Sequence, residues 1–276
     1  MRFGLVALGL FALMVGLCGC AGPGTAPSRV AATDSGGTTG NGGDIVTASD
    51  EPALRKRARL RMELSIGYFE ANQPEVALDE VKQSLVIDPT YADAYNLRGL
   101  IYMRLEDPGL AEDSFRRAIA INPRDPNTLH NYGWLLCQQN RFGDASQQFS
   151  LALAIPSYLD RPKTLMTQGL CQIRAGNRVE AERVLMQAYE LDAGNPVVGF
   201  NLAQLLVLRG EWSRAQFYVR RVNNGPSANA ETLWVGVRIE HRLNNREAMT
   251  QLAGQLQRRF PQSREALAYE RGTFDD

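Results

Sequence analysis

The side chains with the greatest chemical potential in this sequence are four cysteines and two histidines. His130 and His241 lie far apart, and neither has cysteine, histidine or carboxylate partners at a spacing typical of a metal site. The sequence also lacks a phosphate-binding glycine loop, a dinucleotide fingerprint and a serine-hydrolase elbow. We therefore predict that the protein is not an enzyme and has no catalytic, cofactor or metal site and no small-molecule substrate.

Cys20 is the cysteine whose neighbours indicate a covalent modification. Met1-Arg2 precede a continuous apolar run from Phe3 to Leu17, which leads into Leu17-Cys18-Gly19-Cys20. An apolar segment of about fifteen residues behind a basic residue is typical of a secretory signal and is shorter than the ~20 residues of a membrane span. The last four residues resemble a bacterial lipobox, in which the final cysteine is diacylated and becomes the new N-terminus. We predict a signal peptide over 1–19 and lipidation of Cys20; the alternative is a plain signal peptide or an uncleaved anchor.

The residues after Cys20 predict where the protein is held. Ala21, not aspartate, follows the cysteine, and in the lipoproteins of Gram-negative bacteria that this N-terminus resembles, such a residue permits export to the outer membrane. Acyl chains contribute roughly 0.8 kcal/mol per buried CH₂, so that several of them form a lasting anchor. Residues 20–50 are rich in Gly, Ser and Thr and are predicted to be a flexible tether. The folded part is then expected to face the periplasm.

Cys137 and Cys171 are the remaining cysteines, and the sequence leaves their state open. An oxidising periplasm permits a disulfide between them. They fall at positions 12 and 10 of two neighbouring predicted helices, and this difference favours two separate buried or half-buried thiols.

The elements that carry these residues follow from a repeat of about 34 residues. From Ala92 to Leu159 two such units show small residues and large apolar residues in the same order, with Gly99 matching Gly133 and Phe115 matching Phe149. This period and pattern are typical of tetratricopeptide repeats, in which two antiparallel helices cross closely. We expect a small residue at position 8 of the first helix to face the small residue at position 20 of the second.

Extending this register predicts an all-α, superhelical array of six helix-turn-helix repeats over residues 51–276. The units cover about 58–91, 92–125, 126–159, 162–195, 196–228 and 229–261, and a capping helix from Ser263 to Tyr269 follows. The marker alanines at position 20 are Ala77, Ala111, Ala145, Ala181, Ala215 and Ala248, and the residues at position 8 are Ser65, Gly99, Gly133, Gly169, Ala203 and Gly236. Two extra residues lengthen the turn between the third and fourth units, where Tyr158 or Leu159 either faces a partner or belongs to an ordinary turn insertion.

The charge pattern excludes one class of partner. Thirty basic residues balance thirty acidic residues, and the absence of a long basic stripe argues against binding of nucleic acid. The basic cluster of Arg55, Lys56, Arg57, Arg59 and Arg61 favours a solvated helix face, with contact to lipid phosphate as the alternative.

Function is therefore expected from a protein-binding surface. In tetratricopeptide arrays the first helices line a concave groove, which exposes roughly positions 2, 5, 9, 12 and 13. Here these positions hold Met62, Ile66, Phe69, Asn96, Leu100, Met103, His130, Trp134, Cys137, Met166, Leu170, Ile173, Phe200 and Val207. Large apolar residues at exposed positions mark a partner surface, and this set suits an extended peptide or an amphipathic helix.

The third unit carries a closer resemblance. The run His130-Asn131-Tyr132-Gly133-Trp134-Leu135-Leu136-Cys137-Gln138-Gln139-Asn140-Arg141-Phe142 resembles the corresponding segment of the type IV pilus biogenesis lipoproteins PilF and PilW. The plan of lipobox, tether and six repeats resembles that family over essentially the whole chain. Trp134 and the longer glycine-rich tether depart from the family pattern.

This resemblance implies a pilotin, which is an outer-membrane lipoprotein that binds the secretin subunit and promotes its localisation and ring assembly. The groove would then hold a segment of the secretin. The alternative class is a general envelope scaffold that organises peptidoglycan enzymes or outer-membrane assembly factors through the same repeats.

Overall fold

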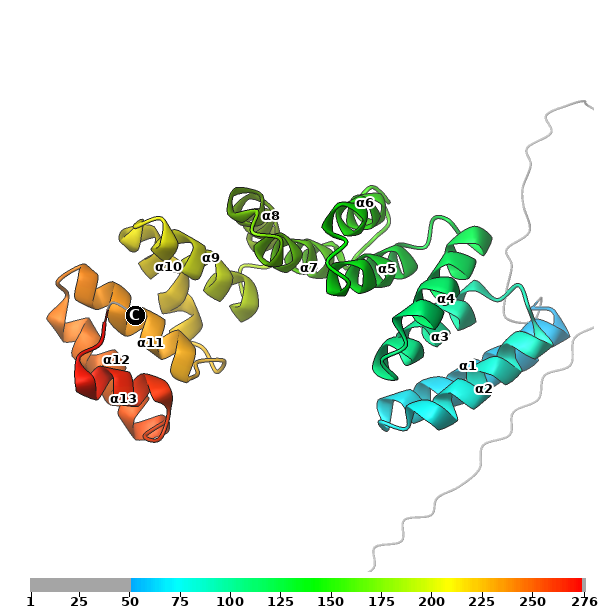
Figure 1. The fold of residues 1–276 in the computed structure, drawn as a ribbon, viewed down its shortest axis with the longest axis horizontal. Coiled ribbons are helices and arrows are strands. Elements are labelled where there is room, and N and C mark those ends of the chain that lie inside the picture. Colours follow the sequence, from blue (N-terminus) through cyan, green and yellow to red (C-terminus); the bar gives the residue numbers. More distant parts are fainter. Residues whose placement is uncertain (1–50, 275–276) are drawn as a thin grey trace, which may run out of the picture. The chain divides into compact units, whose positions relative to one another are not determined.

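The computed structural model describes residues 51–274, which form thirteen α-helices (Figure 1). Twelve of them form antiparallel pairs: α1 (Ala53–Glu70) with α2 (Pro74–Ile87), α3 (Ala92–Arg104) with α4 (Pro108–Ile121), α5 (Pro126–Gln138) with α6 (Phe142–Leu153), α7 (Arg161–Arg174) with α8 (Arg178–Leu191), α9 (Pro196–Leu208) with α10 (Trp212–Asn223), and α11 (Ala230–Arg242) with α12 (Arg246–Arg259). The last helix, α13 (Arg264–Arg271), contacts both α11 and α12. The predicted all-α array of six helix pairs is confirmed. Cys20, the signal sequence and the tether lie outside the described residues.

Local sequence signals fix the starts of many helices. Proline occupies the first turn of α2, α4, α5 and α9, where its missing N–H would have no helical partner in any case. The side chains of Asp107, Asp125 and Asn195 accept hydrogen bonds from the backbone N–H groups that begin α4, α5 and α9. Ser263 caps α13 in the same way, by accepting from the N–H of Ala266 at 3.1 Å.

Each turn inside a pair contains one residue in the left-handed conformation. These residues are Asn72, Glu106, Asn140, Gly176, Gly210 and Asn244, with φ between 56° and 78°. Glycine and asparagine adopt this conformation at low cost. Glu106 is the exception, because its side chain does not favour a φ of 59°. The packing of the two helices therefore imposes the left-handed conformation on this turn residue, even where the residue type does not favour it.

Close helix crossing inside the pairs depends on glycine opposite a large side chain. A Cβ atom built on Gly133 would lie 2.8 Å from the ring of Phe149, and one built on Gly169 would lie 2.5 Å from Leu185. Position 8 thus accommodates the residue at position 24, in addition to the expected neighbour at position 20. In the first unit the Ser65 hydroxyl at position 8 donates to the carbonyl of Ala77 at position 20, at 2.7 Å.

The register of the sixth unit differs from the prediction by one residue. The turn residues of successive pairs mark the register. Asn244 follows Gly210 by the same interval that separates Asn72 from Glu106. The sixth unit therefore begins at Ala230, where α11 starts, and not at residue 229. Position 8 is then Val237 and position 24 is Ala253, both buried, whereas Ala248 is only partly buried. At this crossing the large residue is on the first helix and the small residue is on the second. The recurring alanine pattern therefore predicts Ala248 at the crossing, where the structure places Ala253.

The pairs stack in chain order. Each first helix contacts the next first helix, from α1 and α3 to α9 and α11, and each second helix contacts the first helix that follows it. Among the described residues the backbones of the second helices do not lie beside one another, but their side chains reach across, as the Tyr218 hydroxyl of α10 donates to the Met186 sulfur of α8 at 3.0 Å. The first helices line one side of the array, and buried residues within and between successive pairs form a series of core clusters along the stack.

Candidate functional site

The described residues carry neither a metal-holding cluster nor a membrane-spanning helix. Between residues 51 and 274 there is no group of three or more His, Cys, Asp or Glu side chains that could hold a metal ion. In the same range no helix is long and apolar enough to cross a membrane. Helix-pair repeats bind partners through their surfaces, so the location of open apolar side chains indicates the candidate site.

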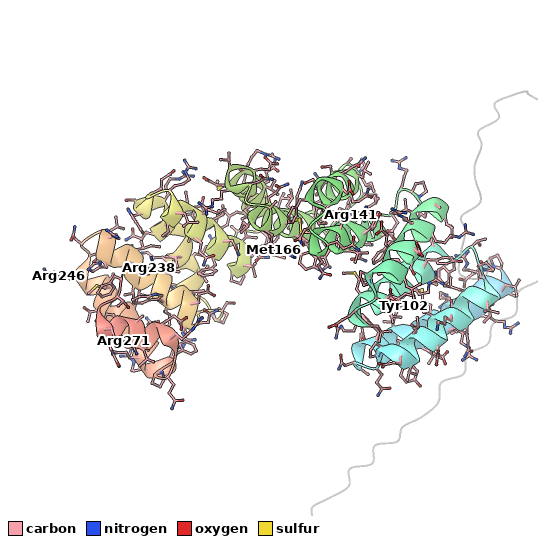
Figure 2. All side chains as sticks on the ribbon, in the orientation of Figure 1. Tyr102, Arg141, Met166, Arg238, Arg246 and Arg271 are labelled. Atoms are coloured by element: carbon pink, nitrogen blue, oxygen red, sulfur yellow. A yellow bond between two sulfur atoms is a disulfide. The ribbon has the colours of Figure 1, made fainter. Side chains whose placement is uncertain are left out.

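The predicted groove residues lie on the first helices, and most are only partly exposed. Met62, Ile66 and Phe69 pack on the core of the first two pairs, and Leu100, Met103 and Trp134 pack on the next core cluster. Met166, Ile173, Phe200 and Val207 pack on the core that follows, and Met166 is labelled on α7 in Figure 2. Asn96 accepts a hydrogen bond from Asn131 at 3.0 Å. These residues belong as much to the packing between repeats as to an open groove.

His130 and Cys137 were assigned to the groove incorrectly, because both side chains are buried. The Nδ1 atom of His130 lies 2.8 Å from the hydroxyl of Thr164, and its ring packs beside Phe149. Tyr158 was expected as a possible contact for a partner, but its ring is buried and its hydroxyl lies 2.7 Å from the same Thr164. The inserted turn therefore folds inward at Tyr158, and Leu159 remains exposed.

Burial has an electrostatic consequence for His130. It lowers the pKa of the imidazole from 6.5 to about 4, because the cation would lose its hydration, and the nearby positive charge of Lys163 lowers the pKa further. The ring is therefore neutral at neutral pH and serves as a hydrogen-bonded core residue.

Cys137 on α5 and Cys171 on α7 form a disulfide, with a Cα–Cα distance of 5.9 Å. The preference for separate thiols was wrong. Positions 12 and 10 of two adjacent first helices are therefore close enough for a bridge, and unequal position numbers do not exclude one. The bridge covalently links the third pair to the fourth.

Two shallow hollows do open on the side of the first helices. One has a volume of about 280 Å³ and is lined by Gln204, Val207, Leu208, Val235 and Arg238, from α9 and α11. The other has about 290 Å³ and is lined by Met103, Glu106, Pro108, Leu135, Gln138 and Gln139. Val207 and Met103 are the two predicted groove residues that line them.

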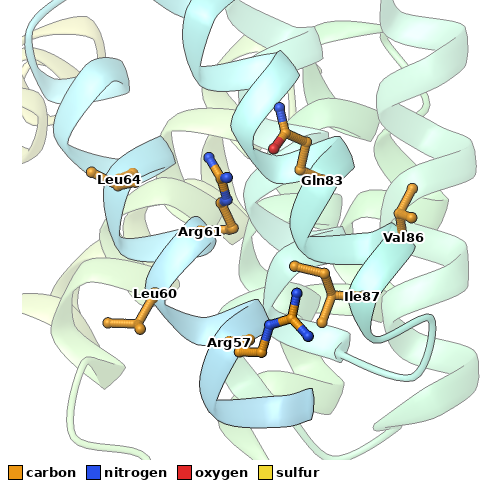
Figure 3. A pocket seen from close by; sticks show the side chains of 7 residues that line it. All are labelled: Arg57, Leu60, Arg61, Leu64, Gln83, Val86 and Ile87. Atoms are coloured by element: carbon orange, nitrogen blue, oxygen red, sulfur yellow. The ribbon is translucent and has the colours of Figure 1, made fainter. Parts of the chain in front are cut away.

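An open apolar surface lies at the start of the array, on α1 and α2. A hollow of about 440 Å³ is lined by Arg57, Leu60, Arg61 and Leu64 from α1 and by Gln83, Val86 and Ile87 from α2 (Figure 3). Leu60 and Leu64 are each 50% exposed, and Val86 is 81% exposed. We call this surface the N-terminal face. Leu60, Leu64 and Val86 lie outside the groove positions of the repeat, so the groove pattern does not predict this face.

The repeat register explains why this face is open. Leu60 and Leu64 occupy positions 3 and 7 of the first unit. In units three to six these positions are buried, and Tyr132 contacts the preceding pair by donating to Glu112 of α4 at 2.8 Å. Residues at positions 3 and 7 of units three to six are Thr128 and Tyr132, Thr164 and Gln168, Val198 and Leu202, and Thr232 and Gly236, all buried. The N-terminal face therefore has the shape that normally receives a helix.

Charges at the N-terminal face are partly neutralised. Arg61 pairs with Glu80 at 2.8 Å, Arg59 pairs with Glu63 at 2.5 Å and Arg55 pairs with Asp88. Lys56 and Arg57 are exposed and have no ion pair within residues 51–274. The predicted basic cluster is thus largely a set of surface ion pairs, and Arg57 is the cation that remains beside the leucines.

Comparison with known families identifies the repeats. Models of the tetratricopeptide repeat match residues 92–125 and 114–147. The first of these ranges covers the predicted second unit, and the helix pairs on either side continue the same architecture. The array is therefore built from tetratricopeptide repeats, as the spacing predicted.

Individual relatives cover most of the chain. The type IV pilus assembly protein PilF of Pseudomonas aeruginosa is 27% identical over 231 residues, which are 82% of this chain and 92% of that protein. Its solved structure matches with a TM-score of 0.71 at 27% identity and covers 79% of this chain and 99% of that one. The structure of PilW, described as a widely conserved type IV pilus biogenesis factor, matches with a TM-score of 0.68 at 27% identity over 78% of this chain and 98% of that one. An uncharacterised protein of Haemophilus influenzae is 28% identical over 138 residues, 49% of this chain and 75% of that protein. The predicted resemblance to PilF and PilW is confirmed.

Proposed function

Because this chain is a tetratricopeptide-repeat protein that matches PilF and PilW over most of its length, we propose that it is an assembly factor of a type IV pilus. The observation that carries the proposal is the extent of the match, which includes nearly all of both relatives. A tetratricopeptide motif alone would support only a protein-binding role.

In this role the protein is lipidated at Cys20, is anchored in the outer membrane and faces the periplasm. It binds the secretin subunit and promotes secretin localisation and multimerisation. The lipobox-like sequence Leu17-Cys18-Gly19-Cys20 supports the anchor. The disulfide between Cys137 and Cys171 is consistent with an oxidising compartment such as the periplasm.

We assign the secretin contact to the N-terminal face. Its leucines stand at positions that a helix covers in the later repeats, so the expected ligand is an amphipathic helix of the secretin with an apolar stripe. A carboxylate beside that stripe would pair with Arg57. The groove on the first helices is the competing location, and the experiment below separates the two.

The test compares charged substitutions on the two surfaces in cells that lack the native copy. Leu60→Glu with Leu64→Glu should abolish secretin multimers in membrane fractions, because two carboxylates would have to be buried against the apolar stripe. Both leucines are half-exposed, so the variant should fold normally. Leu267→Glu on α13 is the matched control, since Leu267 is also an exposed leucine, and it should leave the multimers intact.

The groove arm of the test uses Leu100→Glu with Trp134→Glu. Loss of multimers in this variant alone, with the array still folded, would move the contact to the first helices. Intact multimers in both variants would overturn binding of the secretin through either surface. Recovery of peptidoglycan enzymes or outer-membrane assembly factors, in place of the secretin, by the periplasmic part would support the general scaffold.

The anchor has a separate test. Cys20→Ala should release the protein from the outer-membrane fraction, because no other acyl attachment site is predicted. Unchanged fractionation of this variant would refute the lipid anchor without affecting the assignment of the binding face.

A further inference from the structure

The segment that follows α13 folds back onto α11. Gly272 ends α13 in the left-handed conformation, with φ of 69°, which glycine adopts at low cost. The N–H of Thr273 then donates to the carbonyl of Ala268 at 3.1 Å. This sharp turn directs Phe274 toward α11.

Phe274 is held by a set of side chains that contact both its ring and its backbone. The ring stacks on the imidazole of His241, with centroids 4.2 Å apart and an angle of 13° between the planes. It also stacks against Trp234, at 5.7 Å, and meets Tyr269 edge-on at 6.1 Å. The Nε atom of Arg238 donates to the backbone carbonyl of Phe274 at 2.9 Å.

The three recognition residues of α11 share one helix face. Trp234, Arg238 and His241 follow one another at intervals of four and three residues, which places them in a row on the helix surface. An aromatic surface with an arginine between its two rings can bind an aromatic side chain and the adjacent peptide group together. Nothing in this arrangement requires that the bound segment belong to the same chain.

Arg238 also borders the hollow between α9 and α11 that is described above, and Figure 2 labels this residue on α11. The hollow has apolar walls from Val207, Leu208 and Val235 and a polar end at Gln204. Arg238 therefore belongs both to the site that holds Phe274 and to the lining of the hollow. A segment longer than residues 272–274 could place an aromatic ring on His241 and a second apolar side chain in the hollow.

We propose that this face of α11 binds an extended peptide segment with an aromatic residue, and that residues 272–274 occupy the site in cis. Arg238 holds a backbone carbonyl of the peptide, Trp234 and His241 hold its ring, and the hollow receives a neighbouring apolar side chain. A partner segment must displace Phe274 before it binds. This inference is independent of the proposed pilus function, because its evidence is the contact within this chain.

Effective concentration explains how a weak contact can close the site. A segment tethered by a short linker has an effective concentration in the millimolar range. The cis segment raises the apparent Kd of a free ligand by about the ratio of this effective concentration to the segment's own Kd, and a partner with additional contacts in the hollow replaces it. Removing the Phe274 ring should open the site to a free peptide.

The experiment uses the full chain and a fluorescein-labelled peptide with the sequence of residues 271–276, Arg-Gly-Thr-Phe-Asp-Asp. Fluorescence anisotropy should show saturable binding to the Phe274→Ala variant, and at least ~10-fold weaker binding to the unaltered protein, in which the cis segment competes. A peptide with alanine in place of phenylalanine should bind neither protein. The double variant Phe274→Ala with Arg238→Gln should lose binding while its thermal transition stays that of Phe274→Ala.

Two results would overturn the proposal. The first is equal affinity of the peptide for the unaltered protein and for Phe274→Ala, because the cis segment would then not occupy the site. The second is no saturation of a folded Phe274→Ala variant at millimolar peptide, because the contact would then be only the packing of a chain end. Circular dichroism of each variant verifies folding before the titration.

Discussion

Gly99 on α3 and Phe115 on α4 touch so closely that a Cβ atom on the glycine would lie 2.5 Å from the Cε1 atom of the ring. Phe115 is fully buried, and its ring has no free space into which it could withdraw. The glycine is therefore required by packing and not by backbone conformation.

Gly99→Ala should lower the free energy of unfolding by about 1 to 3 kcal/mol, the usual cost of an overpacked core. The better helix propensity of alanine, ~1 kcal/mol, offsets part of this loss. Chemical denaturation by urea measures the difference. Gly67→Ala on α1 is the matched control, because a Cβ there meets nothing within 4 Å.

The control should be neutral or more stable, since only the helix propensity changes at Gly67. If Gly99→Ala proved as stable as Gly67→Ala, the close crossing of α3 and α4 would not be a constraint on the fold. A combined loss in both variants would instead indicate a general intolerance of alanine in these helices.

The disulfide between Cys137 and Cys171 should contribute about 3 to 4 kcal/mol to stability. It closes a loop whose ends are 34 residues apart, and the chain entropy removed from the unfolded state grows with the logarithm of loop length. Reduction with dithiothreitol should therefore lower the thermal midpoint of the intact protein.

The double variant Cys137→Ala with Cys171→Ala is the control for this prediction. Its midpoint should already be low and should not respond to dithiothreitol. A midpoint of the unaltered protein that is insensitive to full reduction, verified by thiol titration, would contradict a stabilising role for the bridge.

Sequence periodicity predicted the architecture of the array because the crossing of each pair restricts side-chain size. Small residues such as Gly133 and Ala145 recur since the helices cannot approach otherwise. The same criterion failed in the sixth unit, where Val237 and Ala253 exchange large and small residues across the crossing. Such an exchange keeps the total side-chain volume at the crossing, so a pattern of one small residue at a fixed position does not predict it.

The surfaces were harder to predict, because exposure depends on which neighbour is present. His130 stands at a groove position by number, but the inserted turn brings Tyr158 and Thr164 over it. Leu60 is open for the opposite reason, since no pair precedes the first unit within residues 51–274. Burial at these positions is a property of the stack, which position numbers within one repeat do not describe.

His130 should make the protein less stable in mild acid. The folded-state pKa is about 4, below the 6.5 of an exposed histidine, so between these values the unfolded chain binds more protons and stability rises with pH. On acidification, stability is lost progressively from about pH 6.5, by roughly 1.4 kcal/mol at about pH 5.5, and the loss levels off below the folded pKa. Urea unfolding at neutral pH and near pH 5.5 measures this loss.

His130→Gln removes the titrating group but keeps a side chain that can bond to Thr164. Carboxylates elsewhere add their own pH dependence, so the informative quantity is the difference between the two proteins. The variant should lose about 1.4 kcal/mol less than the unaltered protein between the two pH values. Parallel stability curves would show that the His130 imidazole titrates with an unperturbed pKa.

Glu240 on α11 has a carboxylate that is only 1% exposed and is held by three neighbours. Its oxygens accept hydrogen bonds from Gln216 at 2.8 Å, Arg220 at 2.9 Å and Asn245 at 2.9 Å. These donors come from α10 and from the turn before α12, so one side chain connects the fifth pair to both parts of the sixth.

Glu240→Ala should lower the free energy of unfolding by about 1 to 3 kcal/mol, because it removes the acceptor of three hydrogen bonds and leaves the partly buried Gln216 and Asn245 without that acceptor, whereas the half-exposed Arg220 can bond to water. The exposed ion pair of Arg183 and Glu180, at 2.6 Å, is the matched control, and Glu180→Ala should cost less than about 1 kcal/mol. Urea unfolding of the two variants under the same conditions gives the comparison. Equal, small losses in both would mean that water replaces the carboxylate of Glu240 without cost, and the junction between the fifth and sixth pairs would then be held by apolar packing alone.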